Sequence, residues 1–493
     1  MFILIASIIF CGLPLILLYV HLKWAKEDLK LGIPGPPCIP ILGNLHLLWN
    51  YIKEEKLHEI ILDLINEYGE TIRVRVGPKL FIFTTEVKLV EAIVNNPKFM
   101  KSDDYKIYQP WLGDGLILAH GEKWHKMRKL LTPAFHFQIL GRFVPIFQEQ
   151  AEVFVEKVRN LGPEENINVA PWLQSFALDV VSESSMGVKL NAQNDPNRDF
   201  VVASKELLDT LCLRFYYPLY NIDFIWKLTS HYKKCCDRIR FINGFVNDVI
   251  NQRREKLLNE KSPDPSEEKP ALLDILLQST IDDSPLSNEA IRDEMNTFMV
   301  AGHETTGTTM GFVIFLLAKH QEVQEKVFLE IKENSLNQKL SIRDINSLRY
   351  LDCVIKETLR LYPILPDAIK QSAEDFTLRK YFIPAKTSIL TSIHAVHRLE
   401  KNFKNPDEFN PDRFLDEISN EERSPYTYQP FSAGLRNCIG QRFAMLEMKT
   451  LLIQVLSEYK IHLGTKNFEI DLRESTLLFS RNGVNVKFEK RKK

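Results

Sequence analysis

One cysteine lies in a setting that favours metal binding. The segment from Phe431 to Gly440 reads Phe-Ser-Ala-Gly-Leu-Arg-Asn-Cys-Ile-Gly, and its cysteine is Cys438. Apolar side chains recur with helical spacing from Phe443 to Val455, which predicts a helix with one buried face. The positive N-terminal end of a helix stabilises a thiolate over a thiol, and the thiolate is the form that binds metal. Cys438 is therefore a candidate metal ligand.

The neighbours of Cys438 suit a flat, anionic cofactor. Gly434 and Gly440 let the backbone pass close to a flat group, because neither carries a Cβ. Arg436 offers a fork of donors that suits a carboxylate such as a haem propionate. Together these residues describe an axial thiolate ligand beneath a haem. A structural cysteine in a Gly-rich turn is the alternative interpretation.

The pattern Phe-x-x-Gly-x-Arg-x-Cys-x-Gly resembles the haem-binding signature of the cytochrome P450 superfamily. The segments Leu-Thr-Pro-Ala-Phe-His at 131–136 and Asn-Pro-Asp-Arg-Phe at 410–414 are similar to family 4, and most like its insect-type microsomal members. The resemblance covers the chain from Pro34 to Phe488, although Leu435 stands where the family often has proline. It implies haem b with Cys438 as the axial ligand and with Phe431 and Gly440 beside the cofactor.

Trp124 and Arg128 resemble the Trp-x-x-x-Arg motif of the same family. Residues four apart share one face of a helix, where an indole N–H and a guanidinium can both reach a propionate. An ordinary surface helix with an isolated tryptophan is the alternative. Lys123, Lys126 and Lys129 on this helix are interpreted either as a docking face for an acidic redox partner or as a solvated charged surface.

A second site is expected within a helical run from about Ser287 to past Leu317. Gly302 costs up to ~1 kcal/mol in mid-helix, and a threonine there can divert a backbone carbonyl, so this weak stretch indicates a functional groove. Glu304 and Thr305 resemble the acid–alcohol pair through which the family delivers protons for O–O bond cleavage. His303 is interpreted as a structural or hydrogen-bonding residue and is left out of the site, because adjacent helix positions point away from one another.

Ala301 departs from the family-4 pattern. Many members have a glutamate here that can esterify the haem, which alanine cannot do, so we predict that the haem is bound non-covalently. The resemblance also places 363–369 in the substrate pocket opposite Ala301. Lys370 stands where relatives often carry an arginine that points toward a propionate.

Glu357 and Arg360 resemble the family's Glu-x-x-Arg. Their i, i+3 spacing brings the two charges together on a helix, and Arg413 from the later Pro-Asp-Arg-Phe segment is expected to join them. If the group is buried, removal of one partner leaves an unpaired charge that costs ~3–5 kcal/mol. A routine helix ion pair is the alternative interpretation.

The composition is that of a globular protein with ample core. The 493 residues are 45% hydrophobic and 26% charged, and a net charge of −1 argues against a nucleic-acid binder. The seven cysteines form no paired spacing, which favours a reducing, cytosolic environment.

The chain begins with an apolar stretch from residue 2 to residue 20 that is long enough to cross a membrane as a helix. Lys23, Lys26 and Lys30 follow it, so the positive-inside rule places the rest of the chain in the cytosol. A cleaved signal peptide is the alternative. We predict an anchor at 1–22, a basic and Pro-rich hinge at 23–40 and a catalytic domain at 41–493.

The remaining pattern predicts a mainly helical fold with a minor β region, preceded by a single transmembrane helix. Short β-like runs occur at 71–76, 80–84 and 376–390, and 477–488 is predicted to be a hairpin that turns at Asn482-Gly483. By resemblance, the irregular segment 101–123 covers the substrate pocket. Clustered aromatic residues at 215–226 are expected either at a membrane interface or in the core.

The resemblance implies a haem-thiolate monooxygenase on the cytosolic face of the endoplasmic reticulum, anchored by one span. It would insert one oxygen atom from O2 into a fatty acid, hydrocarbon, terpenoid hormone or foreign compound. NADPH–cytochrome P450 reductase would supply the electrons, and cytochrome b5 is a further expected partner. A haem-thiolate isomerase or dehydratase that acts on peroxides, and a non-catalytic haem-binding sensor, are the alternatives.

Overall fold

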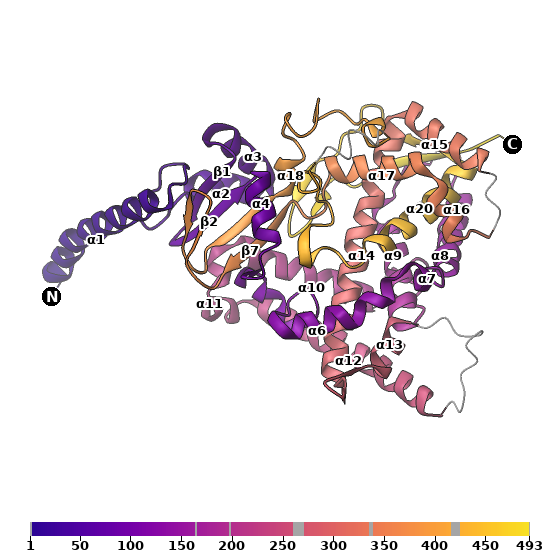
Figure 1. Ribbon diagram of the computed structural model, residues 1–493, viewed down its shortest axis with the longest axis horizontal. Coiled ribbons are helices and arrows are strands. Elements are labelled where there is room, and N and C mark those ends of the chain that lie inside the picture. Colours follow the sequence, from indigo (N-terminus) through magenta and orange to yellow (C-terminus); the bar gives the residue numbers. More distant parts are fainter. Residues whose placement is uncertain are drawn as a thin grey trace. The chain divides into compact units, whose positions relative to one another are not determined.

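The computed structural model describes residues 2–162, 165–196, 199–259, 271–334, 339–415 and 424–492; the side chains of 2–13, 215, 216 and 218 lie outside this description. The chain folds into two compact units (Figure 1). Unit 1 comprises Met1–Asp104, Leu365–Asp407 and Glu421–Asn437, and unit 2 comprises Tyr105–Ile364, Glu408–Asn420 and Cys438–Lys493.

Unit 1 is built on a mixed five-stranded sheet. Its strands are β1 (Thr71–Val76), β2 (Lys79–Thr84), β10 (Ser388–Ser392), β7 (Asp367–Ser372) and β3 (Phe99–Lys101), in that spatial order. β2 and β10 are parallel, and the other neighbours are antiparallel. Ile72, Val74 and Ile82 are buried in this sheet, as β-branched residues on a covered face should be. The predicted strands at 71–76 and 80–84 are confirmed.

Helices flank this sheet, and α3 packs against β1 (Figure 1). The helices of unit 1 are α1 (Phe2–Leu31), α2 (Leu45–Glu54), α3 (Leu57–Tyr68), α4 (Val87–Val94), α18 (Ile393–Val396) and the 3-10 turn η5 (Gly434–Arg436). A separate hairpin joins β8 (Phe376–Leu378) to β9 (Tyr381–Ile383).

The helix α1 continues past residue 22 into the predicted hinge. Its C-terminal end is fixed by Arg75, which is only 2% exposed and whose Nη2 lies 2.9 Å from Glu27 Oε2 and 3.1 Å from Asp28 Oδ1. The guanidinium also lies over the ring of Trp24, a cation–π contact. Within the part of the chain that the structure describes, no helix is long and apolar enough to cross a membrane, so the predicted transmembrane helix is not confirmed.

Unit 2 is organised around the long helix α14 (Asn288–Lys319), which packs along α9 (Ala170–Met186). Ser287 caps α14, because its side chain accepts a hydrogen bond from the Ala290 N–H at 3.1 Å. A Cβ added to Gly302 would lie 2.7 Å from Val181 Cγ2. The glycine therefore serves the close approach of α9, and its helix-weakening effect is not by itself a sign of function.

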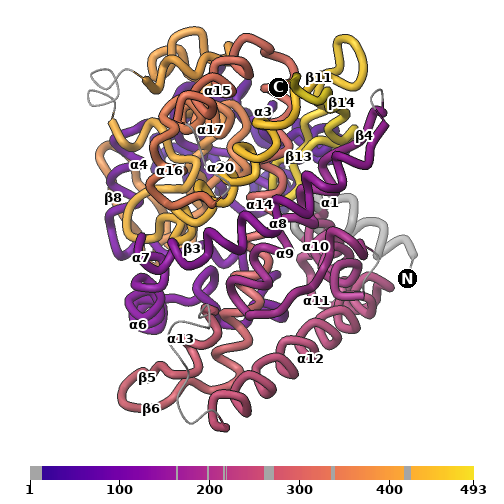
Figure 2. Tube along the Cα trace, turned by 90° about the vertical axis from the view of Figure 1, so that its right-hand side faces the viewer, coloured from indigo at the N-terminus to yellow at the C-terminus, as the bar shows by residue number. Residues whose placement is uncertain are grey.

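The other helices of unit 2 surround this pair (Figure 2). The α-helices are α5 (Gln109–Leu112), α6 (Gly121–Leu131), α7 (Phe137–Leu140), α8 (Val144–Arg159), α10 (Asp199–Tyr216), α11 (Asp223–Lys227), α12 (Ser230–Asn259), α13 (Leu272–Gln278), α15 (Gln321–Glu333), α16 (Ile342–Ser347), α17 (Arg349–Leu361) and α20 (Gln441–Glu458). The 3-10 turns are η2 (Thr132–Phe135), η3 (Pro218–Asn221) and η4 (Pro411–Phe414), while η1 (Asp103–Tyr108) begins in unit 1.

Three small sheets complete unit 2. One has the order β11-β14-β4, and two hairpins pair β12 with β13 and β5 with β6. The strands are β4 (Ile167–Asn168), β5 (Thr280–Ile281), β6 (Ser284–Pro285), β11 (Tyr459–Leu463), β12 (Leu472–Glu474), β13 (Leu478–Ser480) and β14 (Asn485–Lys490).

The prediction of a hairpin across Asn482-Gly483 is wrong. The strand before the turn, β13, pairs with β12, whereas the strand after it, β14, pairs with β11 and β4. Gly483 has φ +74°, and a Cβ there would lie 2.4 Å from Asn168 Nδ2, so the turn passes the chain from one sheet to another. The broader prediction, a mainly helical fold with minor sheets, is confirmed.

Candidate functional site

Cys438 stands just before the N-terminus of α20, as predicted. Burial raises the pKa of its thiol, while the backbone N–H groups of Gly440 and Gln441 and the charge of Arg128 act in the opposite direction. The side chain is nevertheless exposed. An accessible thiol with N–H donors and a cation beside it fits an axial ligand to haem.

Arg128 and Trp124 share one side of α6 in unit 2. Both are partly buried, and burial lowers the pKa of Arg128 while the Cys438 thiolate raises it. Trp124 packs against the same hydrophobic core as Ile439, the residue after Cys438. The structure thus brings Arg128 within electrostatic reach of Cys438, and Trp124 and Ile439 pack against the same core.

Unit 1 holds a group of three cations, of which Lys370 is buried and Lys101 and Arg436 are partly buried. Lys101 in β3 lies opposite Lys370 in β7. Burial, Arg436 and Lys370 lower the pKa of Lys101 to about 7, and burial and Arg436 lower the pKa of Lys370 to about 8. Buried like charges destabilise one another, so this cation cluster (Lys101, Lys370 and Arg436) suits an anion such as a propionate. Sequence reasoning missed Lys101, because only the strand register reveals it.

Gly434 and Gly440 in the cysteine loop have different surroundings. Gly434 has φ +70°, and a Cβ there would lie 2.4 Å from the carbonyl oxygen of Val94. The backbone packing of unit 1 is therefore sufficient to explain this glycine, without any cofactor. A Cβ on Gly440 would meet only Cys438 Sγ, at an ordinary 3.9 Å, which leaves Gly440 for the approach of a ligand. Phe431 is partly buried in unit 1.

The predicted groove on α14 is open along one side. Ala301, Glu304 and Thr305 are partly exposed, although the helix around them is largely buried. The Thr305 hydroxyl donates a hydrogen bond to the Ala301 carbonyl at 2.7 Å, which is the diversion of a helix carbonyl that the sequence indicated. An acid and an alcohol therefore stand side by side at an accessible stretch of a buried helix.

His303, interpreted from the sequence as a structural or hydrogen-bonding residue outside the site, does make such contacts, and one of its partners is Glu304. His303 Nε2 lies 3.1 Å from Glu304 Oε1, and Gln174 Nε2 from α9 donates to Glu304 Oε2 at 3.3 Å. The geometric argument considered only the directions of adjacent Cβ atoms. Two long side chains in a closely packed interface can meet at their tips, and this contact decides the charge of Glu304.

The loop before α6 is attached to the N-terminal part of α14. The Asp114 N–H donates to Asp293 Oδ2 at 3.0 Å, and the Leu116 N–H donates to Glu294 Oε2 at 3.1 Å. Burial raises the pKa of Glu294 to about 8. The predicted pocket-covering segment is thus fixed to the helix that carries Glu304 and Thr305.

Glu357, Arg360 and Arg413 form the buried ionic group that the sequence predicted. Arg360 Nε lies 2.8 Å from Glu357 Oε2, and Arg413 Nε lies 2.9 Å from Glu357 Oε1. The side chains of Glu357 and Arg360 are 0% exposed. The Asn410 N–H adds a further donor to Glu357 Oε1 at 3.0 Å. The group ties α17 to η4.

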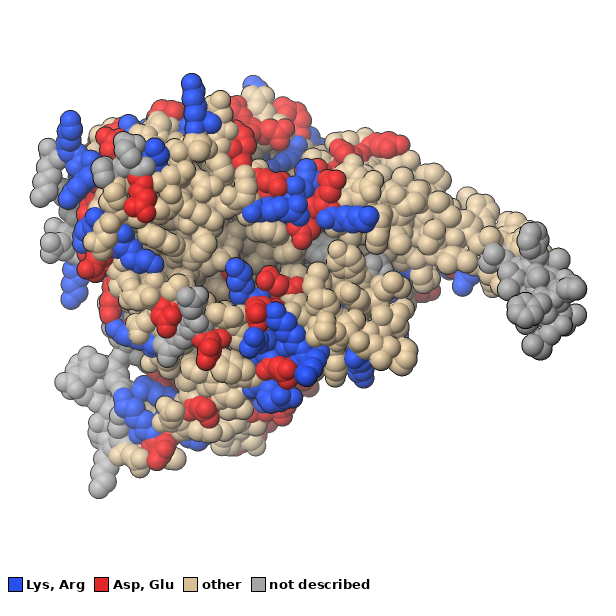
Figure 3. Space-filling view, turned by 180° about the vertical axis from the view of Figure 1, so that it is seen from behind, with Lys and Arg blue, Asp and Glu red and all other residues tan. Residues whose placement is uncertain are grey.

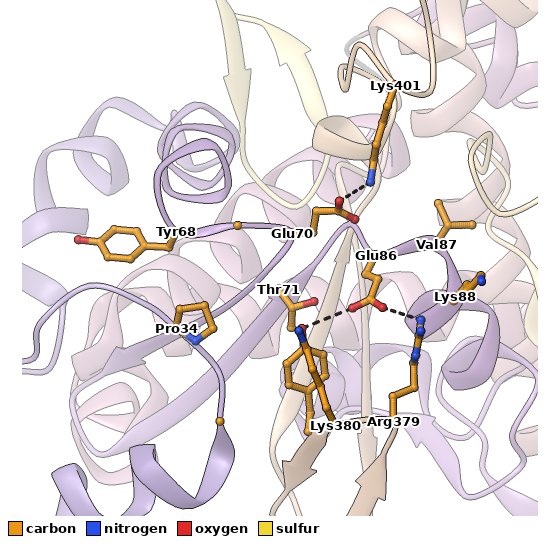
Figure 4. Close-up of a pocket in the computed structure, with 13 residues that line it drawn as sticks. Pro34, Tyr68, Glu70, Thr71, Glu86, Val87, Lys88, Arg379, Lys380 and Lys401 are labelled. Carbon is orange, nitrogen blue, oxygen red and sulfur yellow. Dashed lines mark hydrogen bonds and ion pairs between the residues drawn. The ribbon is translucent and has the colours of Figure 1, made fainter.

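A pocket of about 560 Å³ lies in unit 1 beside Pro34 (Figure 4). Its carboxylates are already paired: Glu86 with Arg379 at 2.6 Å, and Glu70 with Lys401 at 2.5 Å. None of the predicted site residues lines this pocket, so it does not compete with the cysteine loop and α14 as the place of chemistry.

Comparison with known proteins agrees with this geometry. The family model described as cytochrome P450 matches residues 33–488. The chain is 38% identical to cytochrome P450 4d2 of Drosophila melanogaster over 445 residues, which are 87% of this chain and 88% of the relative. It is 37% identical to cytochrome P450 4d1 of the same fly, over 94% of each chain. It is 36% identical to cytochrome P450 4c21 of Blattella germanica, over 92% of each chain.

Proposed function

The chain belongs to the cytochrome P450 family, in the insect-type part of family 4, and we propose that it is a reductase-dependent enzyme that inserts one oxygen atom from O2 into an apolar substrate. Family membership makes it a haem-thiolate monooxygenase. The observation that carries the proposal is the accessible Cys438 thiol, which stands at the start of α20 with Arg128 as its neighbouring cation.

The residues present fit a haem, which when bound supplies the centre at which oxygen is activated. Cys438 would hold the iron. Arg128 and Arg436 would bind the propionates as charged donors, with Trp124 as an N–H donor. Within unit 1, Lys101 and Lys370 accompany Arg436 and would suit the same kind of carboxylate. Their lowered pKa values show that burial is costly for them, and a bound carboxylate would offset that cost.

Glu304 and Thr305 are proposed to relay protons to the reacting oxygen. Glu304 can exchange a proton with its surroundings, and the Thr305 hydroxyl can pass one on by releasing the Ala301 carbonyl that it now binds at 2.7 Å. Ala301 has no group that could esterify a haem, which supports non-covalent binding. The substrate would occupy the space along the exposed side of α14.

We also propose attachment to the endoplasmic reticulum membrane with the catalytic units in the cytosol. Uncharged side chains cover most of the described part of α1 (Figure 3), and Leu15 and Tyr19 are 66% and 67% exposed. In unit 2, Phe224 and Leu228 are each 73% exposed, which suits contact with lipid better than a core. Alkaline extraction of membranes, followed by mass spectrometry of the intact chain, distinguishes an anchor from a cleaved signal peptide. A retained anchor predicts that the protein stays in the membrane with its N-terminal segment intact.

NADPH–cytochrome P450 reductase is the proposed electron donor, with cytochrome b5 as a second partner. The lysines of α6 give this only modest support. Lys123 is paired with Asp114 at 2.7 Å, and Lys126 is paired with Asp282 at 2.7 Å, so both charges are partly satisfied within the protein. Docking of an acidic partner on α6 would have to compete with these pairs.

Reconstitution with the reductase tests the proposal. The full-length protein, in lipid vesicles with reductase and NADPH, should oxidise NADPH faster when a suitable fatty acid, hydrocarbon or terpenoid is added, and a product with one added oxygen should appear. The variant Cys438→Ser should yield no product. If the reductase neither reduces the parent protein nor supports product formation, the monooxygenase proposal fails. That result would favour the interpretation as an isomerase or a sensor.

A further inference from the structure

His303 is a buried histidine with both ring nitrogens engaged. It is 7% exposed. Nδ1 lies 3.0 Å from the Met299 carbonyl oxygen, and Nε2 lies 3.1 Å from Glu304 Oε1. The ring is therefore held between its own helix backbone and the carboxyl group to which the proposed function assigns proton transfer.

The two contacts of the ring show that His303 and Glu304 share one proton, in the hydrogen bond between Nε2 and Oε1. A carbonyl oxygen can only accept, so Nδ1 must carry a proton. Nε2 then either donates a proton to the Glu304 carboxylate or accepts one from the Glu304 carboxyl group. In both cases one proton lies between Nε2 and Oε1, and the pair cannot dispense with it without losing the hydrogen bond.

The surroundings favour the ionic form of the pair. Burial opposes the charge on His303, but the Glu304 carboxylate and the Met299 carbonyl outweigh it and raise the pKa of the imidazole. Burial likewise opposes the charge on Glu304, but His303 outweighs it and lowers the pKa of the carboxyl group. Gln174 donates to the other carboxylate oxygen from α9, which also favours the charged acceptor.

Two charged side chains of α10 interact electrostatically with Glu304. Lys205 acts on the pKa of Glu304, and Glu304 in turn acts on the pKa of Asp209. Both α10 side chains are exposed. Lys205 therefore helps His303 to keep Glu304 charged.

We propose that His303 is a positioning residue for oxygen activation: it shares one proton with Glu304 and, together with Gln174, holds the Glu304 carboxylate until that proton is needed. This rests on the proposed function of Glu304. In the resting state both oxygens of Glu304 are occupied, one by His303 and one by Gln174. Delivery of a proton toward Thr305 requires Glu304 to exchange one of these partners for the hydroxyl or a water. The imidazole then takes up a proton from solvent, which restores the pair.

The test uses full-length holoprotein in vesicles and two independent readouts. The infrared carboxyl band of Glu304, assigned by its loss in Glu304→Gln, reports the pKa without turnover. His303→Leu removes a charge-assisted hydrogen bond, which should raise that pKa by roughly 1–2 because only Gln174 and Lys205 then oppose the effect of burial. His303→Gln keeps a neutral donor and should give an intermediate value.

The second readout is the ratio of product formed to NADPH oxidised, followed against pH. In His303→Leu the ratio should fall about tenfold or more, and its pH dependence should move in the alkaline direction with the carboxyl band. Gln174→Leu should also lower the ratio, by less, since it removes a neutral donor. Met310→Leu, at a buried position on the same helix, controls for disturbance of α14 and should leave both readouts unchanged.

An unchanged Glu304 band in His303→Leu would overturn the proposal, as would a loss of coupling no greater than that of Met310→Leu. If the parent protein forms no product with any substrate, the proposed function fails instead, and the infrared titration still decides whether His303 sets the proton on Glu304.

Discussion

Substitution of Glu357 by glutamine should break the ion pairs that join α17 to η4. The change preserves shape and removes one charge. Glu357 accepts from Arg360 through both oxygens, at 2.8 and 2.9 Å, and from Arg413 at 2.9 Å. The amide nitrogen of glutamine would face guanidinium donors, and Arg360, at 0% exposed, would keep a buried charge without a carboxylate.

The expected cost follows from that burial. Removal of one partner from a buried pair costs ~3–5 kcal/mol, because the remaining charge stays desolvated. A loss of this size is a large part of the stability of an ordinary domain. Glu357→Gln should therefore unfold at a clearly lower urea concentration than the parent and should retain little haem on purification, as measured by pyridine haemochrome and by the carbon monoxide difference spectrum.

A matched control lies one residue from Arg413. Asp412 in η4 pairs with Lys326 at 3.2 Å, but the two side chains are 52% and 54% exposed. Asp412→Asn should cost no more than ~1 kcal/mol. The double variant Glu357→Gln with Arg360→Met removes both charges of the buried pair and should recover part of the loss. The explanation by burial is wrong if Glu357→Gln retains a normal haem content and unfolds at the same urea concentration as Asp412→Asn.

Three further predictions concern the cysteine loop, the cofactor and pH. Gly434→Ala should lower the free energy of unfolding, measured by urea titration, by roughly 2 kcal/mol or more, because φ is +70° and the Val94 carbonyl blocks the added Cβ. The control is Gly244→Ala in α12, where nothing lies within 4 Å of the added Cβ. This variant should be neutral or stabilised by ~0.5–1 kcal/mol in the same titration. Acidified organic solvent should extract all of the haem, since Ala301 cannot form an ester; haem left on the polypeptide would refute this. The pKa of Glu294 is raised to about 8 from an ordinary 4.5, so stability should fall as pH rises from about 4.5 through about 8, and Glu294→Gln should flatten that fall in unfolding measurements at successive pH values.

The features predicted correctly are those set by local pattern. The helix after Cys438, the strand pair at 71–84 and the long helix through Thr305 each follow from periodicity over ten or more neighbouring residues. The Glu357 group was also predictable, because two of its members lie three residues apart on one helix and the third lies in a recognisable motif.

The missed features depend on contacts between distant segments. Lys101 joins the cation cluster only because β3 pairs with β7 in one register. The turn at Asn482-Gly483 reads as a hairpin, yet β13 and β14 have other partners. The contacts of Glu304 also join distant segments, because one of its oxygens meets His303 and the other meets Gln174, more than a hundred residues earlier. No local pattern carries this information.

Ligation by Cys438 is the central claim, and the carbon monoxide difference spectrum of the reduced protein tests it most directly. The parent and the control Cys353→Ser, altered at a buried cysteine, should both show the displaced Soret band of a thiolate-ligated haem carbonyl. Cys438→Ser should lose that band while its fold, followed by circular dichroism, is retained. A thiolate-type spectrum that persists in Cys438→Ser would show that another residue holds the iron and would contradict the account.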